Sequence, residues 1–142
     1  RKQIIKTNNQ SIIYAKSKNI LVKAEESDVI TIINNIIDNA IKYAGKNSKI
    51  HISTSIIKNK KNKEMVLIKI KDNGIGIKEK HLPKITDRFY RVDKARSKNS
   101  NSSGLGLSIV KSLVEKNNGK LKIYSDFGKG TEVCLYLINF IK

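Results

Sequence analysis

Residues 64–77 read EMVLIKIKDNGIGI and combine an apolar stretch with an aspartate and two glycines. Residues 64–71 are rich in branched apolar side chains and predict a β-strand. DNGIGI follows at the exit of that strand, where glycine permits positive φ angles and close approach of a ligand to the backbone. The stretch therefore predicts a strand that ends in a tight turn, and the surrounding elements decide whether the turn belongs to a ligand site.

Alternating or continuous apolar residues clearly predict four strands. They cover residues 49–57, 64–71, 120–125 and 131–138. A basic turn, KNKKNK at 58–63, joins the first two strands, and DFGKG at 126–130 joins the last two. The sequence therefore predicts two hairpins.

Two helices are predicted between and before these hairpins. The first covers 27–44, with Ser27 as its N-cap and Gly45 at its end. Its apolar side holds Val29, Ile33, Ile36, Ala40 and Ala44, and its polar side holds Thr31, Asn35, Asp38, Asn39 and Lys42. The second opens at Gly104-Leu105-Gly106-Leu107 and closes at Gly119. The order predicts an α+β two-layer sandwich, with helices on one face of a mixed, mostly antiparallel sheet.

Three segments carry weaker patterns. Residues 1–15 are expected to be partly helical, and residues 20–23 to form a short strand. Residues 78–103 lose regular periodicity and predict a functional loop or lid, with a short helix around 83–90.

Composition bounds the function classes. The chain has 142 residues and fits one domain, and it has no signal peptide or membrane-spanning run. It begins without methionine, so we expect it to be part of a longer protein. Cys134 is the single cysteine, which excludes an internal disulfide and predicts a buried strand residue. The net charge of +17 is compatible with a polyanionic partner, but the lysines are spread along the chain without an arginine or aromatic cluster.

Six of the eight glycines form three G-x-G pairs at junctions between predicted elements. The pairs are Gly74/Gly76, Gly104/Gly106 and Gly128/Gly130. They match neither G-x-x-x-x-G-K-[ST] nor the three-glycine dinucleotide fingerprint, so a P-loop enzyme and a Rossmann domain are disfavoured. Gly104 and Gly106 precede a predicted helix, whose free N–H groups suit an anion such as a phosphate chain.

Taken in order, these residues resemble the ATP-binding domain of the GHKL superfamily, and within it the catalytic domain of sensor histidine kinases. The resemblance covers residues 28–137. It rests on an N box at 35–43 (NIIDNAIKY), a first glycine box at 72–77, an F box at 87–93 (DRFYRVD), a second glycine box at 104–107 and a last one at 128–131. Five boxes in this order make the resemblance specific, and it implies the sandwich predicted above, with an ATP lid.

The resemblance implies ATP and Mg²⁺ as cofactors. Asn39 would ligate Mg²⁺, and Asn35 one turn earlier would help to hold the metal or the phosphates. Asp72 would accept a hydrogen bond from the adenine amine, and Asn35 and Arg91 would act in catalysis. The residues implied to bind nucleotide are Asn39, Lys42, Tyr43, Asp72, Gly74, Gly76, Arg88, Ser103, Gly104, Leu105, Gly106, Leu107 and Thr131.

Two positions depart from the family pattern. Thr86 stands three residues before Phe89, where the F box usually has a first phenylalanine, so we expect the lid to dock more loosely. Ser102-Ser103 replaces the usual glycine-threonine before the second glycine box. Phe89 and Tyr90 are expected to anchor the lid on the core or on a neighbouring domain.

The resemblance also implies a division of the chain and a set of partners. Residues 1–16 would be a linker or the end of a helical dimerisation domain, and 17–142 the ATP-binding domain. The γ-phosphoryl group would pass to a histidine of that dimerisation domain and then to a response regulator, for which a winged-helix DNA-binding type is one candidate. A homodimer, no direct nucleic-acid contact, and a cytoplasmic domain of a membrane-anchored bacterial sensor are expected. His51 and His81 lack the context of an acceptor histidine.

Two alternatives stay open from the sequence. Another GHKL branch, a serine kinase or an ATPase, shares the boxes, but those ATPases usually have a glutamate four residues before the metal asparagine, where this chain has Asn35. A non-catalytic basic module that binds nucleic acid or an anionic membrane rests on the net charge alone.

Overall fold

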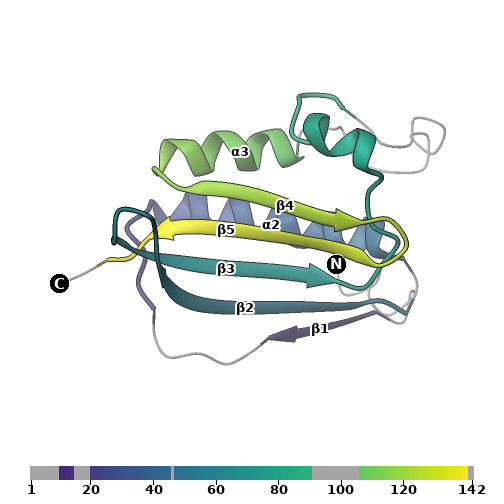
Figure 1. The fold of residues 1–142 in the computed structure, drawn as a ribbon, viewed down its shortest axis with the longest axis horizontal. Coiled ribbons are helices and arrows are strands. Elements are labelled where there is room, and N and C mark those ends of the chain that lie inside the picture. The colour runs from purple at the N-terminus through teal and green to yellow at the C-terminus, as the bar shows by residue number, and fades with distance from the viewer. Residues whose placement is uncertain (1–9, 15–19, 46, 91–105, 141–142) are drawn as a thin grey trace.

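A five-stranded sheet covered by two helices forms the core of the chain (Figure 1). The computed structural model describes residues 10–14, 20–45, 47–90 and 106–140. The elements are β1 (Ser11–Tyr14), α2 (Glu26–Ala44), β2 (Lys49–Lys58), β3 (Glu64–Asp72), the 3₁₀ helix η1 (Glu79–Lys84), α3 (Gly106–Lys116), β4 (Lys120–Asp126) and β5 (Gly130–Ile138). The predicted α+β sandwich is confirmed.

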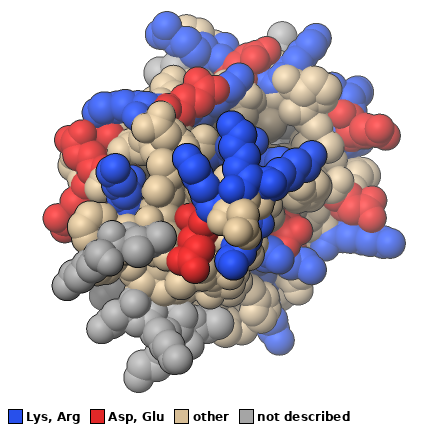
Figure 2. Space-filling model, turned by 60° about the vertical axis from the view of Figure 1, so that its left-hand side comes forward, with Lys and Arg blue, Asp and Glu red and all other residues tan. Residues whose placement is uncertain are grey.

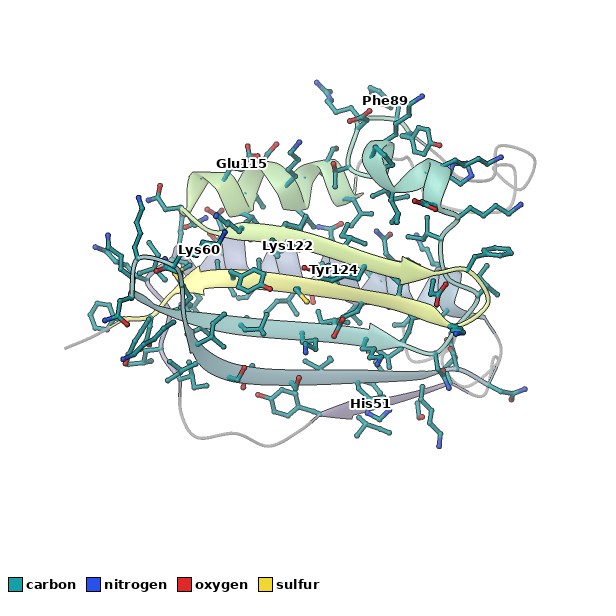
Figure 3. The ribbon with its side chains drawn as sticks, in the orientation of Figure 1. His51, Lys60, Phe89, Glu115, Lys122 and Tyr124 are labelled. Carbon is teal, nitrogen blue, oxygen red and sulfur yellow. The ribbon has the colours of Figure 1, made fainter. Side chains whose placement is uncertain are left out.

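The strand order is β1-β2-β3-β5-β4. Both predicted hairpins are present, and β3 and β5 pair antiparallel at the centre. Alternation sends Val66, Ile68 and Ile70 of β3 toward the helices, where they pack with Ile32 and Ile36 of α2. The opposite face carries polar and aromatic side chains such as Lys122 and Tyr124 (Figure 3). Cys134 is buried, as predicted.

The prediction of helix for residues 1–15 is wrong where the structure describes them. Ser11–Tyr14 forms an edge strand that pairs parallel with β2, from Ser11 beside Lys49 to Tyr14 beside Ile52. All four side chains of this strand are exposed, so it has no buried face. Its sequence, SIIY, accordingly lacks the apolar alternation that predicts a half-buried strand. Residues 20–23 contribute only a single bridge, between Val22 and Asn139.

The start of α2 differs from the prediction, although its end does not. The N-cap is Glu25 rather than Ser27, and it makes no side-chain capping hydrogen bond. Asp28 instead accepts from Asn117 Nδ2 at 3.0 Å and pairs with Lys116 Nζ at 3.1 Å, which ties the start of α2 to the end of α3. Gly45 ends the helix with φ of 97°, as the sequence indicates.

The apolar side of α2 is wider than the helical wheel predicts. Ile32 and Ile41, which are absent from the predicted core side, are fully buried, because α2 packs both on the sheet and against α3, which lies beside it on the same face. The helix after Gly76 also differs from its prediction, since η1 covers Glu79–Lys84 rather than the region around 83–90. Neither α2 nor α3 has the length and apolar character of a membrane-spanning segment, within the residues described.

Candidate functional site

The end of β3 is held against the end of α2 through glycine backbone. A Cβ at Gly74 would lie 2.0 Å from the carbonyl oxygen of Ala44, and Ile75 N donates to that same oxygen at 3.2 Å. Gly76 has φ of 74° and packs against the Asp126 carbonyl oxygen. Here glycine is required by close contact between backbones, so DNGIGI joins β3 to both α2 and the β4–β5 hairpin.

Asp72 lies at this junction and is 8% exposed. Its Oδ1 accepts from Gly74 N at 2.9 Å and from Thr131 N at 3.3 Å. No described residue donates to Oδ2. Gln10 Oε1 is the single fully buried unpaired side-chain atom among the described residues, so Oδ2 is within reach of solvent. The carboxylate is therefore fixed through one oxygen and open through the other.

Burial raises the pKa of the Asp72 carboxyl above the ordinary value of 3.8, and the two backbone hydrogen bonds oppose that rise. Desolvation disfavours the charged form because the surrounding medium solvates it less well than water does. A neighbour that donates a hydrogen bond to Oδ2 would stabilise the carboxylate. The site thus favours a donor, such as an amine, at the open oxygen.

Two amide side chains of α2 converge on the start of α3. A Cβ at Gly106 would lie 3.4 Å from Asn35 Oδ1 and 3.7 Å from Asn39 Oδ1. Asn35 Nδ2 donates to the Thr31 carbonyl at 2.8 Å, which fixes the amide and leaves its oxygen toward Gly106. The structure therefore brings the N box and the second glycine box together, as the family pattern implies.

Other predicted nucleotide residues have different surroundings. Thr131 lies beside Asp72, and its hydroxyl contacts Ser125 Oγ at 2.8 Å. Lys42 is exposed on α2, and Leu107 is half-buried in the first turn of α3. Arg91, Ser103, Gly104 and Leu105 lie outside the described residues, as does the side chain of Tyr43.

A match to a family of known proteins covers most of the chain. Residues 24–139 match the family described as histidine kinase-, DNA gyrase B- and HSP90-like ATPases. The chain belongs to this family. Membership of this family and the α+β sandwich agree with what the sequence resemblance implies.

Curated relatives are named as kinases. The chain is 45% identical over 115 residues to the signal transduction histidine-protein kinase ArlS of Staphylococcus aureus strain USA300, and the same holds for strain COL. The match includes 81% of this chain and 24% of the relative. The chain thus spans about a quarter of the length of the curated relatives it matches.

Solved structures of histidine kinases share the fold. The mycobacterial sensor histidine kinase MprB superposes with a TM-score of 0.76 at 23% identity, over 97% of this chain and 90% of that chain. Full-length ShkA in complex with AMPPNP superposes with a TM-score of 0.79 at 21% identity, over 99% of this chain and 28% of that chain. The architecture is that of the family's kinase members.

Of the two anchors predicted for Phe89, the core and a neighbouring domain, the structure excludes the core. This residue is 64% exposed with φ of 64°, and Figure 3 shows its ring on the outside of the turn after η1, so it does not pack on the core. The Arg88 guanidinium lies over that ring, 5.4 Å from the centroid, and no described contact joins it to Asn35 or Asn39. Tyr90 instead contacts His81 of η1, so this tyrosine anchors the segment locally.

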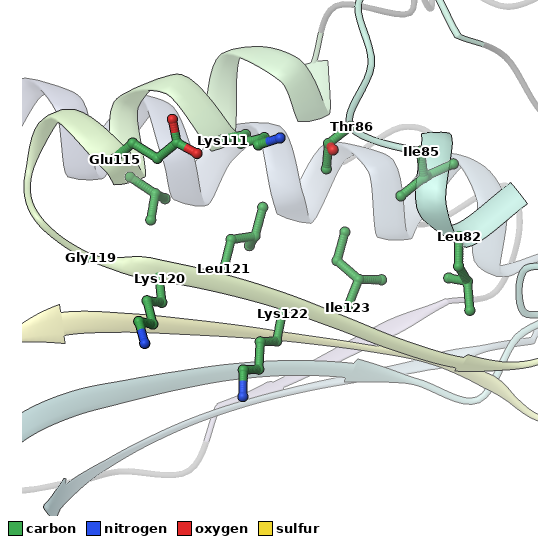
Figure 4. Close-up of a pocket in the computed structure, with 11 residues that line it drawn as sticks. Leu82, Ile85, Thr86, Lys111, Glu115, Gly119, Lys120, Leu121, Lys122 and Ile123 are labelled. Carbon is green, nitrogen blue, oxygen red and sulfur yellow. The ribbon is translucent and has the colours of Figure 1, made fainter. Parts of the chain in front are cut away.

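The position of Thr86 coincides with a cavity of about 390 Å³ between η1, α3 and β4 (Figure 4). Leu82 and Ile85 line it from the η1 side, and Leu121 and Ile123 of β4 point into it from below. Threonine is smaller than the phenylalanine expected in an F box, and its hydroxyl has no hydrogen-bond partner among the described residues. The looser docking of the lid expected from the sequence stays a prediction, because residues 91–105 lie outside the described residues.

Sequence reasoning missed two residues that build the site. Ser125 Oγ accepts from Ile77 N at 2.7 Å and donates to the Gly130 carbonyl, which joins the first and last glycine boxes. A serine at an inward position after Leu121 and Ile123 is the signal that could have found it. Gln10 Nε2 donates to the carbonyls of Ile41 and Gly45 and so caps α2 from a distant segment, which no local pattern reveals.

Asp72→Asn is expected to retain the fold and to lose part of the pH dependence of stability. Asparagine keeps an Oδ1 acceptor for Gly74 N and Thr131 N. In the wild type the folded pKa exceeds the unfolded value, so the free energy of unfolding falls as pH rises from about 4 through the folded pKa. Urea unfolding followed by circular dichroism between pH 4 and pH 7 (about the window in which carboxyl groups titrate) measures the difference.

Asp126→Asn, at an exposed carboxylate of the same hairpin, controls for removal of a charge. A variant of Asp72 that is less stable than wild type by more than about 2 kcal/mol at pH 7, or that shows a steeper fall with pH, would contradict the account of the buried carboxylate.

Thr86→Phe is expected to raise the free energy of unfolding by about 1 kcal/mol, because a phenyl ring would cover the apolar side chains that line part of the cavity. Thr86→Val is the matched control, since it removes the hydroxyl without filling the cavity. Chemical denaturation of the three proteins measures the change. Destabilisation by phenylalanine would show that the walls cannot admit a ring and that the cavity does not reflect the missing aromatic.

Proposed function

We propose that the chain binds ATP with Mg²⁺ and passes the γ-phosphoryl group to a histidine on an adjacent dimerisation domain, for relay to a response regulator. The observation that carries the proposal is Asp72, a buried carboxylate with one oxygen fixed by backbone N–H groups and the other open. Family membership supports nucleotide binding, and the kinase relatives support phosphoryl transfer.

The base-binding end is formed around Asp72. The adenine exocyclic amine would donate a hydrogen bond to Oδ2. This bond would compensate for the hydration that the carboxylate loses because Asp72 is buried. A guanine base presents a carbonyl at that place, which would leave two acceptors facing each other. Asp72 thus selects adenine by the penalty on the wrong base.

The phosphate end is formed where Asn35 and Asn39 face the start of α3. Asn39 lies five residues before Ala44, a rise of about 7.5 Å along α2, so the amides and the Asp72 junction lie along one side of the domain. The donor set fits Mg²⁺, because two amide oxygens converge there and Mg²⁺ takes few protein ligands alongside phosphate and water oxygens. When bound, Mg²⁺ neutralises charge on the phosphates, while Asn39 and Asn35 hold its position. The free N–H groups of α3 would meet phosphate oxygens.

Transfer is favoured over hydrolysis by the chemistry of Asn35. The residue four positions before Asn39 is an amide, and an amide cannot take a proton from water as a carboxylate does. Arg91, implied by the F box, would stabilise the charge that develops on the phosphoryl group. The domain would therefore act by positioning the reacting groups and neutralising the charge on the phosphates, rather than by activating water.

The acceptor and the further partners belong to the proposal as well. The chain matches 24% of the length of the curated kinase relatives. The proposed acceptor histidine would lie in the part of the protein that corresponds to the rest of that length. His51 is exposed on strand β2, and His81 lies in the six-residue 3₁₀ helix η1, so neither lies on a long helix such as a dimerisation domain would supply. A homodimer, membrane anchoring of the whole protein and a winged-helix regulator complete this proposal.

Nucleotide titration tests the two ends separately. We expect the wild type to bind AMPPNP with Mg²⁺ in calorimetry, and Asp72→Asn to weaken that binding at least about tenfold, which corresponds to about 1.4 kcal/mol. Asn39→Ala is expected to remove most of the dependence of affinity on Mg²⁺. Glu132→Gln is the matched control, because that carboxylate lies on the opposite face and pairs with Lys69 at 3.3 Å.

Absence of binding by the wild type at millimolar nucleotide would contradict the proposal. Equal affinity of the wild type and Asp72→Asn would remove Asp72 from base recognition, and equal affinity for AMPPNP and a GTP analogue would do the same.

Steady-state phosphate release separates transfer from hydrolysis. We expect the isolated chain to release inorganic phosphate from ATP no faster than a few turnovers per hour, because Asn35 supplies no general base. Asn35→Glu is expected to raise this rate while nucleotide affinity stays within about threefold. Sustained turnover by the wild type would favour the ATPase branch of the family.

A further inference from the structure

The end of the sheet away from Asp72 gathers residues from three distant segments. Val22 forms an isolated β-bridge with Asn139, and Asn139 N donates to the Glu64 carbonyl at 3.3 Å. Glu64 in turn lies opposite Lys58 in the backbone register of β3 and β2. These backbone contacts run side by side across the end of the sheet. We call this region the distal end and define it by Leu21, Lys58, Lys60, Lys61, Lys63 and Phe140.

Four lysines of the distal end lie in a turn with a fixed backbone. Asn59 Oδ1 accepts from Lys61 N and from Lys63 N, both at 2.9 Å, and Asn59 N donates to the Lys63 carbonyl. All six residues of the turn, 58–63, are exposed. The turn therefore presents its lysines to solvent at a defined place, beyond the ends of β2 and β3 (Figure 3).

Two large apolar side chains lie beside the lysine turn. Leu21 is 54% exposed and Phe140 is 47% exposed, and Phe140 N donates to the Leu21 carbonyl at 3.0 Å. Phe140 follows Asn139, which is hydrogen-bonded to Glu64 at the base of the lysine turn. The distal end thus combines an exposed aromatic and an exposed aliphatic side chain with four cations.

Acidic groups nearby are engaged by other residues. Glu64 Oε2 accepts from Asn139 Nδ2 at 2.8 Å, and Glu25 and Asp28 both pair with Lys116. Within the described residues, no ion pair involves a lysine of the turn. Figure 2, which brings this side forward, shows Lys and Arg side chains gathered at the middle of the face.

We propose that the distal end is a docking surface for an anionic lipid membrane. The lysine ammonium groups lie where they would meet lipid phosphates, and Leu21 and Phe140 would enter the boundary between headgroups and acyl chains. Clustered lysines are attracted to the anionic surface of a bilayer, and exposed apolar side chains add favourable binding free energy when they insert into it. The binding surface does not depend on the proposed kinase function.

The apolar pair favours a membrane over a nucleic acid. Phosphate contacts alone account for non-specific nucleic-acid binding, and they require cations but no exposed aliphatic side chain. A membrane uses both classes of side chain, because its surface is charged and its interior is apolar. The described residues of the distal end contain no arginine.

Docking at this end leaves the candidate nucleotide site accessible. β3 runs from Glu64 at the distal end to Asp72, which is eight residue steps or about 26 Å. Figure 1 shows the start and the end of β3 at opposite ends of the sheet. A bound membrane surface would therefore face away from Asp72.

Vesicle co-sedimentation of the 142-residue chain tests the surface. Vesicles of phosphatidylcholine with 30% phosphatidylglycerol (about the anionic fraction that gives a substantial negative surface potential) are compared with pure phosphatidylcholine. We expect binding to the anionic vesicles only. The variant K58Q/K60Q/K61Q/K63Q should weaken it more than about tenfold, and L21S/F140S should weaken it at least about threefold without a change in charge.

The matched control removes four exposed lysines elsewhere, as K71Q/K80Q/K84Q/K122Q. It has the same net charge as the turn variant and should lose less than about threefold in affinity. An equal loss in both lysine variants would overturn the proposal and assign the binding to diffuse charge. Duplex DNA binding that needs the turn lysines, with vesicle binding unaffected by L21S/F140S, would overturn it in favour of nucleic acid. Circular dichroism and AMPPNP titration of each variant distinguish loss of this surface from loss of the fold or of the nucleotide site.

Discussion

Direct contact between backbones at three glycines determines how the candidate site is built. Gly74 lies against the Ala44 carbonyl, Gly76 against Asp126, and Gly130 against the Asp72 carbonyl, where a Cβ would lie 2.1 Å away. Any side chain at these positions would separate α2, β3 and the β4–β5 hairpin. Close packing has a functional consequence, because it buries the Asp72 carboxyl between segments whose free N–H groups are already aimed at it.

This junction also sets the electrostatics of the site. The Asp72 carboxylate is solvated by two backbone N–H groups instead of a cationic side chain, and its pKa is raised as a result of burial. A lysine or arginine partner would have neutralised it and occupied both oxygens. Asn35 and Asn39 likewise supply uncharged oxygens beside the N-terminus of α3. In the proposed function, both ends would therefore select groups by their hydrogen-bonding character.

The sequence predicted those parts of the molecule in which local pattern and burial coincide. Both hairpins and the end of α2 were predicted because their apolar alternation and Gly45 reflect the packing that the structure shows. β1 was missed because all its side chains are exposed, and Ile32 and Ile41 were missed because α2 packs against the neighbouring helix α3 as well as the sheet. The boxes located Asp72, Asn35 and Asn39, but Gln10, Ser125 and the Leu21–Phe140 pair act through contacts far apart in sequence, which no spacing encodes.

The lysine turn and the candidate nucleotide site lie in separate parts of the fold. The lysines of the turn and Asp72 lie at opposite ends of β3, about 26 Å apart, whereas charges in water are screened within about 8 Å at physiological salt. The turn lysines therefore contribute little to the field at the candidate phosphate end. Energetic coupling between the two ends would require an element with two arrangements. β3 is hydrogen-bonded on both sides along its length and packs its inner face into the core, so it is a rigid spacer rather than such an element.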